Sequence, residues 1–184
     1  KAACLSDKSM FESSECAIIS LRKQAHWDTE ADIFEKTKCH NHIVLCNSTG
    51  SMPETIKSRA SLHNLCIGRV DANQHITWAS LLARLENSWS SIYLKMDMAG
   101  HEYGILRDIL QSASSVFPDM IAMELRSDIG SAEDAPPWKI RLREIPEFTG
   151  FAMMMNGHGY RLIHADWEAT CRSCLNVLWA RIFC

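Results

Sequence analysis

The stretch SSIYLKMDMAGHEYGIL, residues Ser90–Leu106, decides the fold. Its apolar run, Ile92–Met96, predicts a buried strand that carries Lys95 and is followed at once by Asp97. A glycine-containing turn then leads into Glu102–Leu110, whose apolar spacing predicts an amphipathic helix. A strand that ends on charged side chains and turns directly into a helix is typical of the ligand-binding edge of an α/β sheet.

The same alternation of strands and helices runs through the whole chain. Strands are expected at Cys16–Leu21, His42–Cys46, Leu62–Ile67, Ile92–Met96, Met120–Leu125, Tyr160–His164 and Leu175–Ile182. Helices are expected at Asp28–Lys36, Pro53–Arg59, Thr77–Leu85, Glu102–Leu110 and Trp138–Met155, the last of them broken or kinked by Pro146. This order predicts one doubly wound domain over residues 1–184, a three-layer sandwich with a mostly parallel sheet and an antiparallel C-terminal edge.

Composition narrows the classes of function. Of the 184 residues, 47% are hydrophobic and 22% are charged, which is typical of a globular protein and argues against disorder. The net charge of −3 gives no nucleic-acid footprint. No apolar run reaches the ~20 residues that a membrane-spanning helix needs. We therefore expect neither a nucleic-acid partner nor a membrane span in this chain.

The cysteines are numerous and spread along the chain. They are Cys4, Cys16, Cys39, Cys46, Cys66, Cys171, Cys174 and Cys184. An even, dispersed set favours disulfides formed in an oxidising compartment, with zinc ligands and buried free thiols as alternatives. One C-x-x-C without a second pair at finger spacing predicts no metal site. Asn47-Ser48-Thr49 is an N-glycosylation acceptor triplet, which together with the cysteines favours a secreted glycoprotein.

Several segments resemble the FkbM-type, class I S-adenosylmethionine-dependent methyltransferases. YLKMDMAGHEYGIL is similar to their K-I-D-[IV]-E-G-x-E-x-x-[LV]-L signature, through Leu94, Lys95, Asp97, Gly100, Glu102 and Leu106. PDMIAMEL resembles the following strand, which ends in the acid Glu124, and GYRLIHADWEATCRSCLNVLWAR resembles the closing segment. The cysteine-rich form looks like an animal branch of the family that is predicted for the secretory pathway, and this likeness implies a Cys4–Cys16 disulfide tethering residues 1–15.

The resemblance also implies where the cofactor would lie. In the family, a glycine after the first strand leaves room for the methionine end of S-adenosylmethionine, and an acid after the second strand binds the ribose. The corresponding residues here are Arg22 and Cys46, or Asn47 if the register slips by one. Ala99 replaces a further acid of the signature. We therefore expect a non-catalytic module whose cofactor motif is degraded.

The vestigial cofactor site would consist of Ser20, Arg22, Cys46, Asn47, Lys95, Asp97 and Gly100. In the alternative, an active O- or N-methyltransferase, Asp97 and Glu124 would flank the transfer site and S-adenosylmethionine would be the cofactor. Asp97 could equally be the N-cap of the helix that follows it. The favoured module would work by binding a protein partner or by homo-assembly. Cys46 and Cys66 end neighbouring strands and are expected to pair, and Cys171 and Cys174 are expected to be oxidised too.

Overall fold

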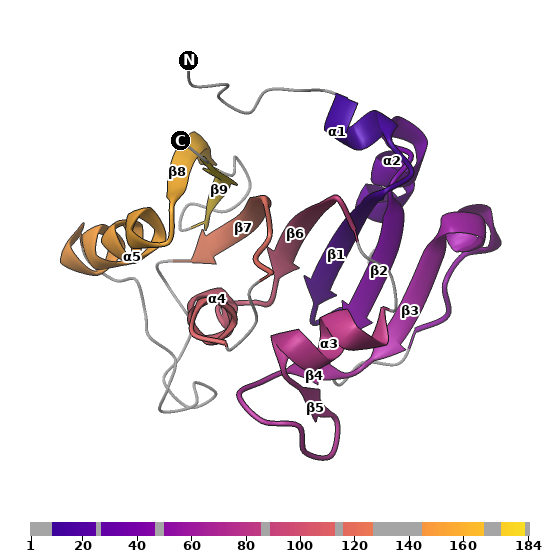
Figure 1. The fold of residues 1–184 in the computed structure, drawn as a ribbon, viewed down its shortest axis with the longest axis horizontal. Coiled ribbons are helices and arrows are strands. Elements are labelled where there is room, and N and C mark those ends of the chain that lie inside the picture. The colour runs from indigo at the N-terminus through magenta and orange to yellow at the C-terminus, as the bar shows by residue number, and fades with distance from the viewer. Residues whose placement is uncertain are drawn as a thin grey trace.

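A seven-stranded sheet forms the centre of the molecule, with the strand order β3-β2-β1-β6-β7-β9-β8 (Figure 1). The structure, a computed structural model, describes residues 9–24, 27–46, 50–85, 89–112, 116–126, 145–167 and 174–182. The strands are β1 (Cys16–Arg22), β2 (His40–Leu45), β3 (Ala60–Asn64), β6 (Ser91–Asp97), β7 (Met120–Arg126), β8 (Tyr160–Trp167) and β9 (Cys174–Arg181). A separate two-stranded sheet pairs β4 (Cys66–Ile67) with β5 (His75–Ile76).

The directions of the strands confirm the predicted α/β fold. β1 pairs in parallel with β2 and β6, β2 with β3, and β6 with β7. β9 runs antiparallel to both β7 and β8, which makes the antiparallel C-terminal edge. The order of the parallel strands reverses between β1 and β6. Open α/β sheets bind their ligands at such a switch point, beyond the carboxyl ends of the strands.

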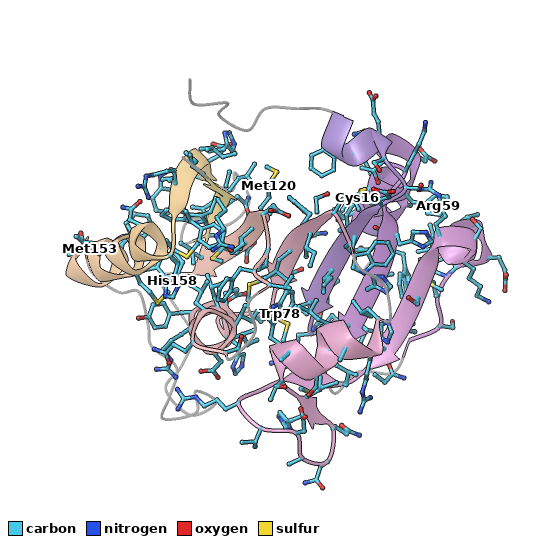
Figure 2. All side chains as sticks on the ribbon, in the orientation of Figure 1. Cys16, Arg59, Trp78, Met120, Met153 and His158 are labelled. Atoms are coloured by element: carbon cyan, nitrogen blue, oxygen red, sulfur yellow. A yellow bond between two sulfur atoms is a disulfide. The ribbon has the colours of Figure 1, made fainter. Side chains whose placement is uncertain are left out.

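Helices cover both faces of the sheet. They are α1 (Ser9–Glu12), α2 (Asp28–Lys36), the 3-10 helix η1 (Glu54–Arg59), α3 (Trp78–Arg84), α4 (Glu102–Leu110) and α5 (Ile145–Gly157). The large core cluster joins α3, α4 and α5 to one face, through side chains such as Leu94, Trp78 and Trp179 (Figure 2). Two smaller clusters join α2 and η1 to the other face, around Ile18 and Ile43. Each fully buried aliphatic side chain contributes ~1.5–3 kcal/mol.

One local expectation is corrected by the structure. The strand expected at Leu62–Ile67 is interrupted at Leu65, because β3 leaves its ladder with β2 after Asn64. The helical region in which Pro146 was expected to cause a break or kink is described only from residue 145 on, and Pro146 is the second residue of α5. Met153 is 69% exposed on α5 and points away from the sheet (Figure 2). The residues Trp138–Glu144 lie outside the described ranges.

The disulfides confirm one expected pair and correct another. Cys46 and Cys66 are bonded, with their Cα atoms 4.5 Å apart. The Cys4–Cys16 pair was wrong, because Cys16 is bonded to Cys39. Cys16 begins β1 and Cys39 immediately precedes its neighbour β2, so the two side chains meet at the same level of the sheet.

The other cysteines are described only in part. Cys174 is also disulfide-bonded. Cys4, Cys171 and Cys184 lie outside the described residues. Disulfides of this kind are typical of proteins from oxidising compartments. Within the described ranges, no helix has the length and apolar character to cross a membrane.

Candidate functional site

Arg22 and Asp97 mark the switch point of the sheet. They are the last residues of β1 and β6, and the register of these parallel strands places them side by side. Ser20 and Lys95 form the pair that lies two residues earlier. Because side chains alternate along a strand, this pair lies on the same face of the sheet as Arg22 and Asp97. The structure therefore brings together four residues that the sequence assigned to the vestigial cofactor site.

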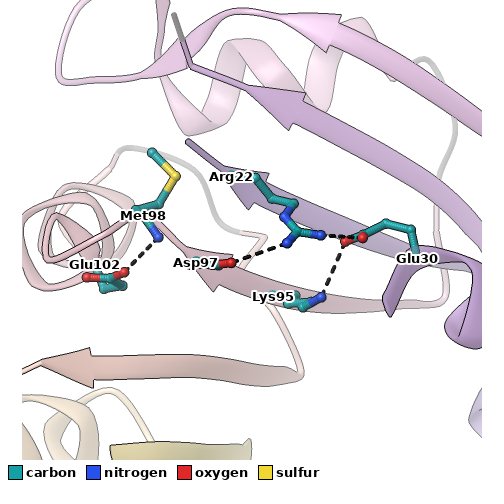
Figure 3. Close-up of polar contacts among 6 residues, drawn as sticks. All are labelled: Arg22, Glu30, Lys95, Asp97, Met98 and Glu102. Atoms are coloured by element: carbon teal, nitrogen blue, oxygen red, sulfur yellow. Dashed lines mark hydrogen bonds and ion pairs between the residues drawn. The ribbon is translucent and has the colours of Figure 1, made fainter. Parts of the chain in front are cut away.

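A buried ion cluster fills this position (Figure 3). Arg22 donates from Nη1 to the carboxylate of Glu30 and from Nη2 to Oδ2 of Asp97, 3.3 Å away. Lys95 Nζ lies 3.3 Å from the other oxygen of Glu30. Arg22 and Glu30 are 4% and 1% exposed, whereas the side chain of Asp97 is 43% exposed. Two cations and two carboxylates thus balance one another at the end of β1.

The sequence interpretation missed Glu30. It lies on α2, where Ile33 and Phe34 follow it at helical spacings of three and four residues. These two apolar side chains pack in the clusters between α2 and the sheet, so Glu30 faces the sheet with them. An acid aligned with the apolar stripe of an amphipathic helix was the available signal. A buried acid of this kind needs a cationic partner, and Arg22 provides it.

Two opposing effects act on the pKa of Lys95. Burial lowers the pKa of its ammonium group, and the carboxylate of Glu30 raises that pKa in the opposite direction. The side chain is 18% exposed, so it reaches inward along the sheet to the cluster. Lys95 therefore belongs to the ion cluster.

The turn after β6 is organised by Glu102. Its carboxylate, 2% exposed, accepts a hydrogen bond of 2.7 Å from the backbone N–H of Met98. Ala99 and Gly100 have positive φ angles of 51° and 93°. Gly100 adopts this left-handed conformation easily, and Ala99 does so at a cost of ~1 kcal/mol. His101 is the N-cap of α4, so Asp97 does not cap this helix.

The Cys46–Cys66 disulfide lies at the end of β2, the strand next to β1. The N–H of Cys46 donates to the carbonyl oxygen of Arg22 at 3.0 Å, which places Cys46 directly beside the ion cluster. The sulfur of Cys46 is bonded to Cys66, which is 2% exposed. Asn47, the other residue proposed for this position and for glycosylation, lies outside the described residues.

Glu124 lies on β7, the strand on the other side of β6. Met123 pairs with Met96, so Glu124 and Asp97 each follow that pair by one residue. Glu124 is half-buried and opposes Asn176 on β9. It has interactions of its own. The two acids named for the alternative enzyme therefore share a level of the sheet.

The arrangement does not fit S-adenosylmethionine bound as in the family. That mode needs free space over the end of the first strand and a ribose acceptor after the second. Arg22 fills the first position with a guanidinium group held by two carboxylates. At the second position, Cys46 offers a disulfide sulfur, which is a weak acceptor.

A cavity lies elsewhere, between α3 and α4. It has a volume of about 400 Å³, and Arg69, Trp78 and Asp108 line it. An ion pair of 2.8 Å joins Arg69 to Asp108 at its rim. None of its lining residues belongs to the site expected from the sequence. The described residues also contain no group of three side chains able to hold a metal ion.

A second polar cluster lies on the opposite face of the sheet. His42 on β2 is 8% exposed, and its Nδ1 lies 2.9 Å from Oγ of Ser61 on β3. Its ring packs against those of His63 and Trp89. Burial, with smaller effects from the neighbouring histidines, lowers the pKa of His42 to about 4. The contact between His42 and His63 was not predicted, because it depends on how β2 and β3 pair.

His42 makes stability depend on pH. Its folded pKa of about 4 lies below the ordinary 6.5, so the unfolded chain binds a proton first as the pH falls. The stabilisation is complete above pH ~6.5 and is lost as the pH falls toward ~4. Between pH 8 and pH 5, we expect the wild type to lose about 2 kcal/mol more than His42→Gln, measured by urea unfolding. Equal losses in the two proteins would contradict this.

The comparison of these two proteins also removes an opposing effect. Burial raises the pKa of Glu102 to about 7, so its carboxyl group destabilises the fold as the pH rises from ~4.5 to ~7. This contribution has the opposite sign to that of His42, and it is the same in the wild type and in His42→Gln. The difference between the two unfolding free energies therefore isolates the histidine.

Comparisons with known proteins support the fold alone. No protein-family model and no curated protein matches the sequence. The fibrillarin pre-rRNA processing protein of Methanococcus jannaschii is 13% identical, with a TM-score of 0.55 over 98% of this chain and 71% of that one. A SAM-dependent methyltransferase from Aquifex aeolicus is 9% identical, with a TM-score of 0.45 over 95% and 87%. A protein of the NADB-Rossmann superfamily from Streptococcus agalactiae is 8% identical, with a TM-score of 0.49 over 98% and 70%.

The strand order and the likeness to the fibrillarin protein both indicate a Rossmann-like fold. Neither bears on the FkbM-type assignment, which stays a prediction. The chain has a Rossmann-like, mostly parallel α/β sheet with an antiparallel C-terminal edge.

Proposed function

We propose that this chain is a methyltransferase-fold protein that has lost cofactor binding and works as a non-catalytic, protein-binding module of the secretory pathway. The observation that carries the proposal is the ion cluster of Arg22, Glu30, Lys95 and Asp97 at the switch point. The sulfonium of S-adenosylmethionine is a cation, so a guanidinium group in this position opposes it by charge as well as by volume.

Displacing Arg22 would also be costly. A cofactor that pushed the guanidinium aside would leave the carboxylate of Glu30, which is 1% exposed, with Lys95 as its remaining partner in the cluster. Breaking a buried ion pair costs ~3–5 kcal/mol, which would weaken binding by a factor of about 10² to 10^3.6. The absence of a ribose-binding acid at Cys46 removes further affinity.

The cysteines support the proposed compartment. The Cys16–Cys39 and Cys46–Cys66 bonds and the oxidised Cys174 support a secretory-pathway protein, because cytosolic thiols are kept reduced. Glycosylation at Asn47 remains part of this proposal. A fold without its ligand keeps its exposed loops and strand edges for contacts with other chains, which supports a role in protein binding.

Thermal unfolding with added ligand tests the loss of cofactor binding. A ligand present at about 100 times its dissociation constant stabilises a protein by ~2.7 kcal/mol, which raises the midpoint by ~5–10 °C for a chain of this size. With 1 mM S-adenosylmethionine or S-adenosylhomocysteine, we expect the midpoint to move by less than ~1 °C. A methyltransferase that binds the cofactor serves as the positive control. A rise of several degrees would instead support the active methyltransferase that the family resemblance implies.

A further inference from the structure

β8 is a long edge strand with an exposed surface. It pairs with β9 along one side and ends the sheet, and no other described strand pairs with its outer side. After the buried Tyr160, all seven residues to Trp167 are exposed. Leu162, Ile163 and Trp167 are 41%, 51% and 62% exposed. Proteins usually protect such edges with charged side chains, proline or β-bulges; this strand has no lysine or proline, but it contains one bulge and the charged residues Arg161 and Asp166.

The exposed side chains of β8 are sorted by face. Residues opposite one another in an antiparallel ladder share a face of the sheet. Leu162 opposes Trp179 and Ala165 opposes Val177, and both of these β9 residues are buried in the core. Trp167 follows Ala165 by two residues and lies on that face too. The core-side face of the strand is therefore apolar although it lies open.

The other face of β8 is polar and charged. Arg161 opposes Ala180, and Asp166 opposes Asn176. Between them a bulge adds one residue, so that Arg161 and Asp166 share a face despite their odd spacing. Measured along β9, His164 opposes Leu178, and Arg161 and Asp166 lie two positions to either side of it. Arg161 and Asp166, which carry opposite charges, are thus equally far from His164 along the ladder.

We infer that β8 pairs antiparallel with β8 of a second copy, about a twofold axis at His164, which joins the two sheets into one. A twofold interface brings the same patch of each copy together. In this register Arg161 of each copy faces Asp166 of the other, and Leu162 faces Ala165. Tyr160 faces Trp167, so the indole ring that is exposed in one copy covers the first residue of the other strand.

The charges are available for this contact. Arg161 donates from Nη1 to the carbonyl oxygens of Tyr160 and Asn156 and to Oδ1 of Asn156. These bonds hold the guanidinium on the surface while no described residue accepts from its Nη2. Within the described ranges, neither Arg161 nor Asp166 forms an ion pair. A second copy therefore supplies the opposite charge for both residues.

This inference rests on the proposed role in protein binding, which it deepens by naming the surface and the partner. It does not depend on the loss of the cofactor. Self-association is measured without any ligand, and the thermal unfolding test is read as a shift of the midpoint on ligand addition. A monomeric chain would therefore leave the loss of cofactor binding untouched, and a ligand-induced shift of the midpoint would leave the dimer untouched.

Sedimentation equilibrium of the disulfide-bonded chain, residues 1–184, provides the test. We expect the wild type to be a dimer. Arg161→Asp places two pairs of like charges across the axis, and so does Asp166→Arg, so each variant is expected to raise the dimer dissociation constant at least about tenfold. The double variant Arg161→Asp/Asp166→Arg restores opposite charges and is expected to dimerise like the wild type. Mixing the two single variants is expected to give a heterodimer, because one carries two acids and the other two arginines.

Two results would overturn the inference. One is a wild-type chain that stays monomeric up to about 100 µM, which would assign the β8 edge to a strand from a different protein. The other is a dimer that neither single charge reversal weakens, which would place the interface elsewhere on the molecule. Recovery in the mixture and in the double variant also shows that the substituted chains are folded.

Discussion

Replacing Arg22 with methionine is expected to lower the free energy of unfolding by about 3–5 kcal/mol. The substitution leaves the carboxylate of Glu30, which is 1% exposed, without its guanidinium partner and with Lys95 Nζ at 3.3 Å. A buried carboxylate that loses a partner keeps the cost of desolvation and loses the compensating attraction. Glu30→Leu is expected to cost a similar amount, since it leaves Arg22 with the half-exposed Asp97. Urea unfolding followed by circular dichroism measures both effects.

The double variant Arg22→Met/Glu30→Leu makes this prediction specific. Replacing both charges by apolar side chains of similar size removes the desolvation cost together with the attraction. We therefore expect the double variant to lie within about 1 kcal/mol of the wild type, with a coupling energy of ~5 kcal/mol or more between the two sites. The matched control is the exposed Asp32–Lys36 pair on the same helix, 2.7 Å apart, where the coupling is expected to be ~0.5 kcal/mol or less. Equal couplings in the two pairs would contradict a buried cluster.

The double variant Cys46→Ala/Cys66→Ala is expected to lose about 3 kcal/mol of stability. The disulfide closes a loop with a sequence separation of 20, and a cross-link restricts the unfolded chain by an amount that grows slowly with loop length. Urea unfolding under oxidising conditions measures the loss. The Cys46–Cys66 bond also ties the end of β2 to β4, which lies outside the main sheet. Without it, we expect hydrogen exchange to increase first in β4 and β5.

The second disulfide supplies a control for this result. Cys16 and Cys39 are separated by 23 residues, so the variant Cys16→Ala/Cys39→Ala is expected to lose nearly the same free energy. Reducing agent should destabilise the wild type by more than either double variant, because each variant has one bond fewer to lose. If removal of either bond left the urea midpoint unchanged, the bond would not constrain the unfolded chain as described.

Much of the fold follows from local patterns in the sequence. Asp28–Lys36 and Glu102–Leu110 were predicted with the bounds that α2 and α4 have, because charges at both ends and one apolar stripe define them. β1 and β6 were predicted to within a residue or two, since a parallel strand buried on both faces is a short apolar run. The interruption at Leu65 was not predictable from periodicity, because it depends on where β2 ends.

The residues of the site were predictable only where a position at the end of one predicted strand was enough to identify them. Arg22, Lys95 and Asp97 follow from the ends of two predicted strands. Glu30 was missed because its role depends on which face α2 turns to the sheet. Cys39 was missed as the partner of Cys16 because the pairing depends on the register between β1 and β2. Contacts that join distant segments need the assembled sheet, and no local pattern encodes them.

Calorimetric titration of the wild-type chain with S-adenosylhomocysteine tests the central claim most directly. The claim is that the guanidinium group of Arg22, held by Glu30 and Asp97, occupies the place that the cofactor needs. We predict no saturable heat up to a ligand concentration of about 1 mM, which corresponds to a binding free energy weaker than ~4 kcal/mol. Saturable binding of one ligand per chain in the micromolar range would contradict the account and restore a functional cofactor site to this sheet.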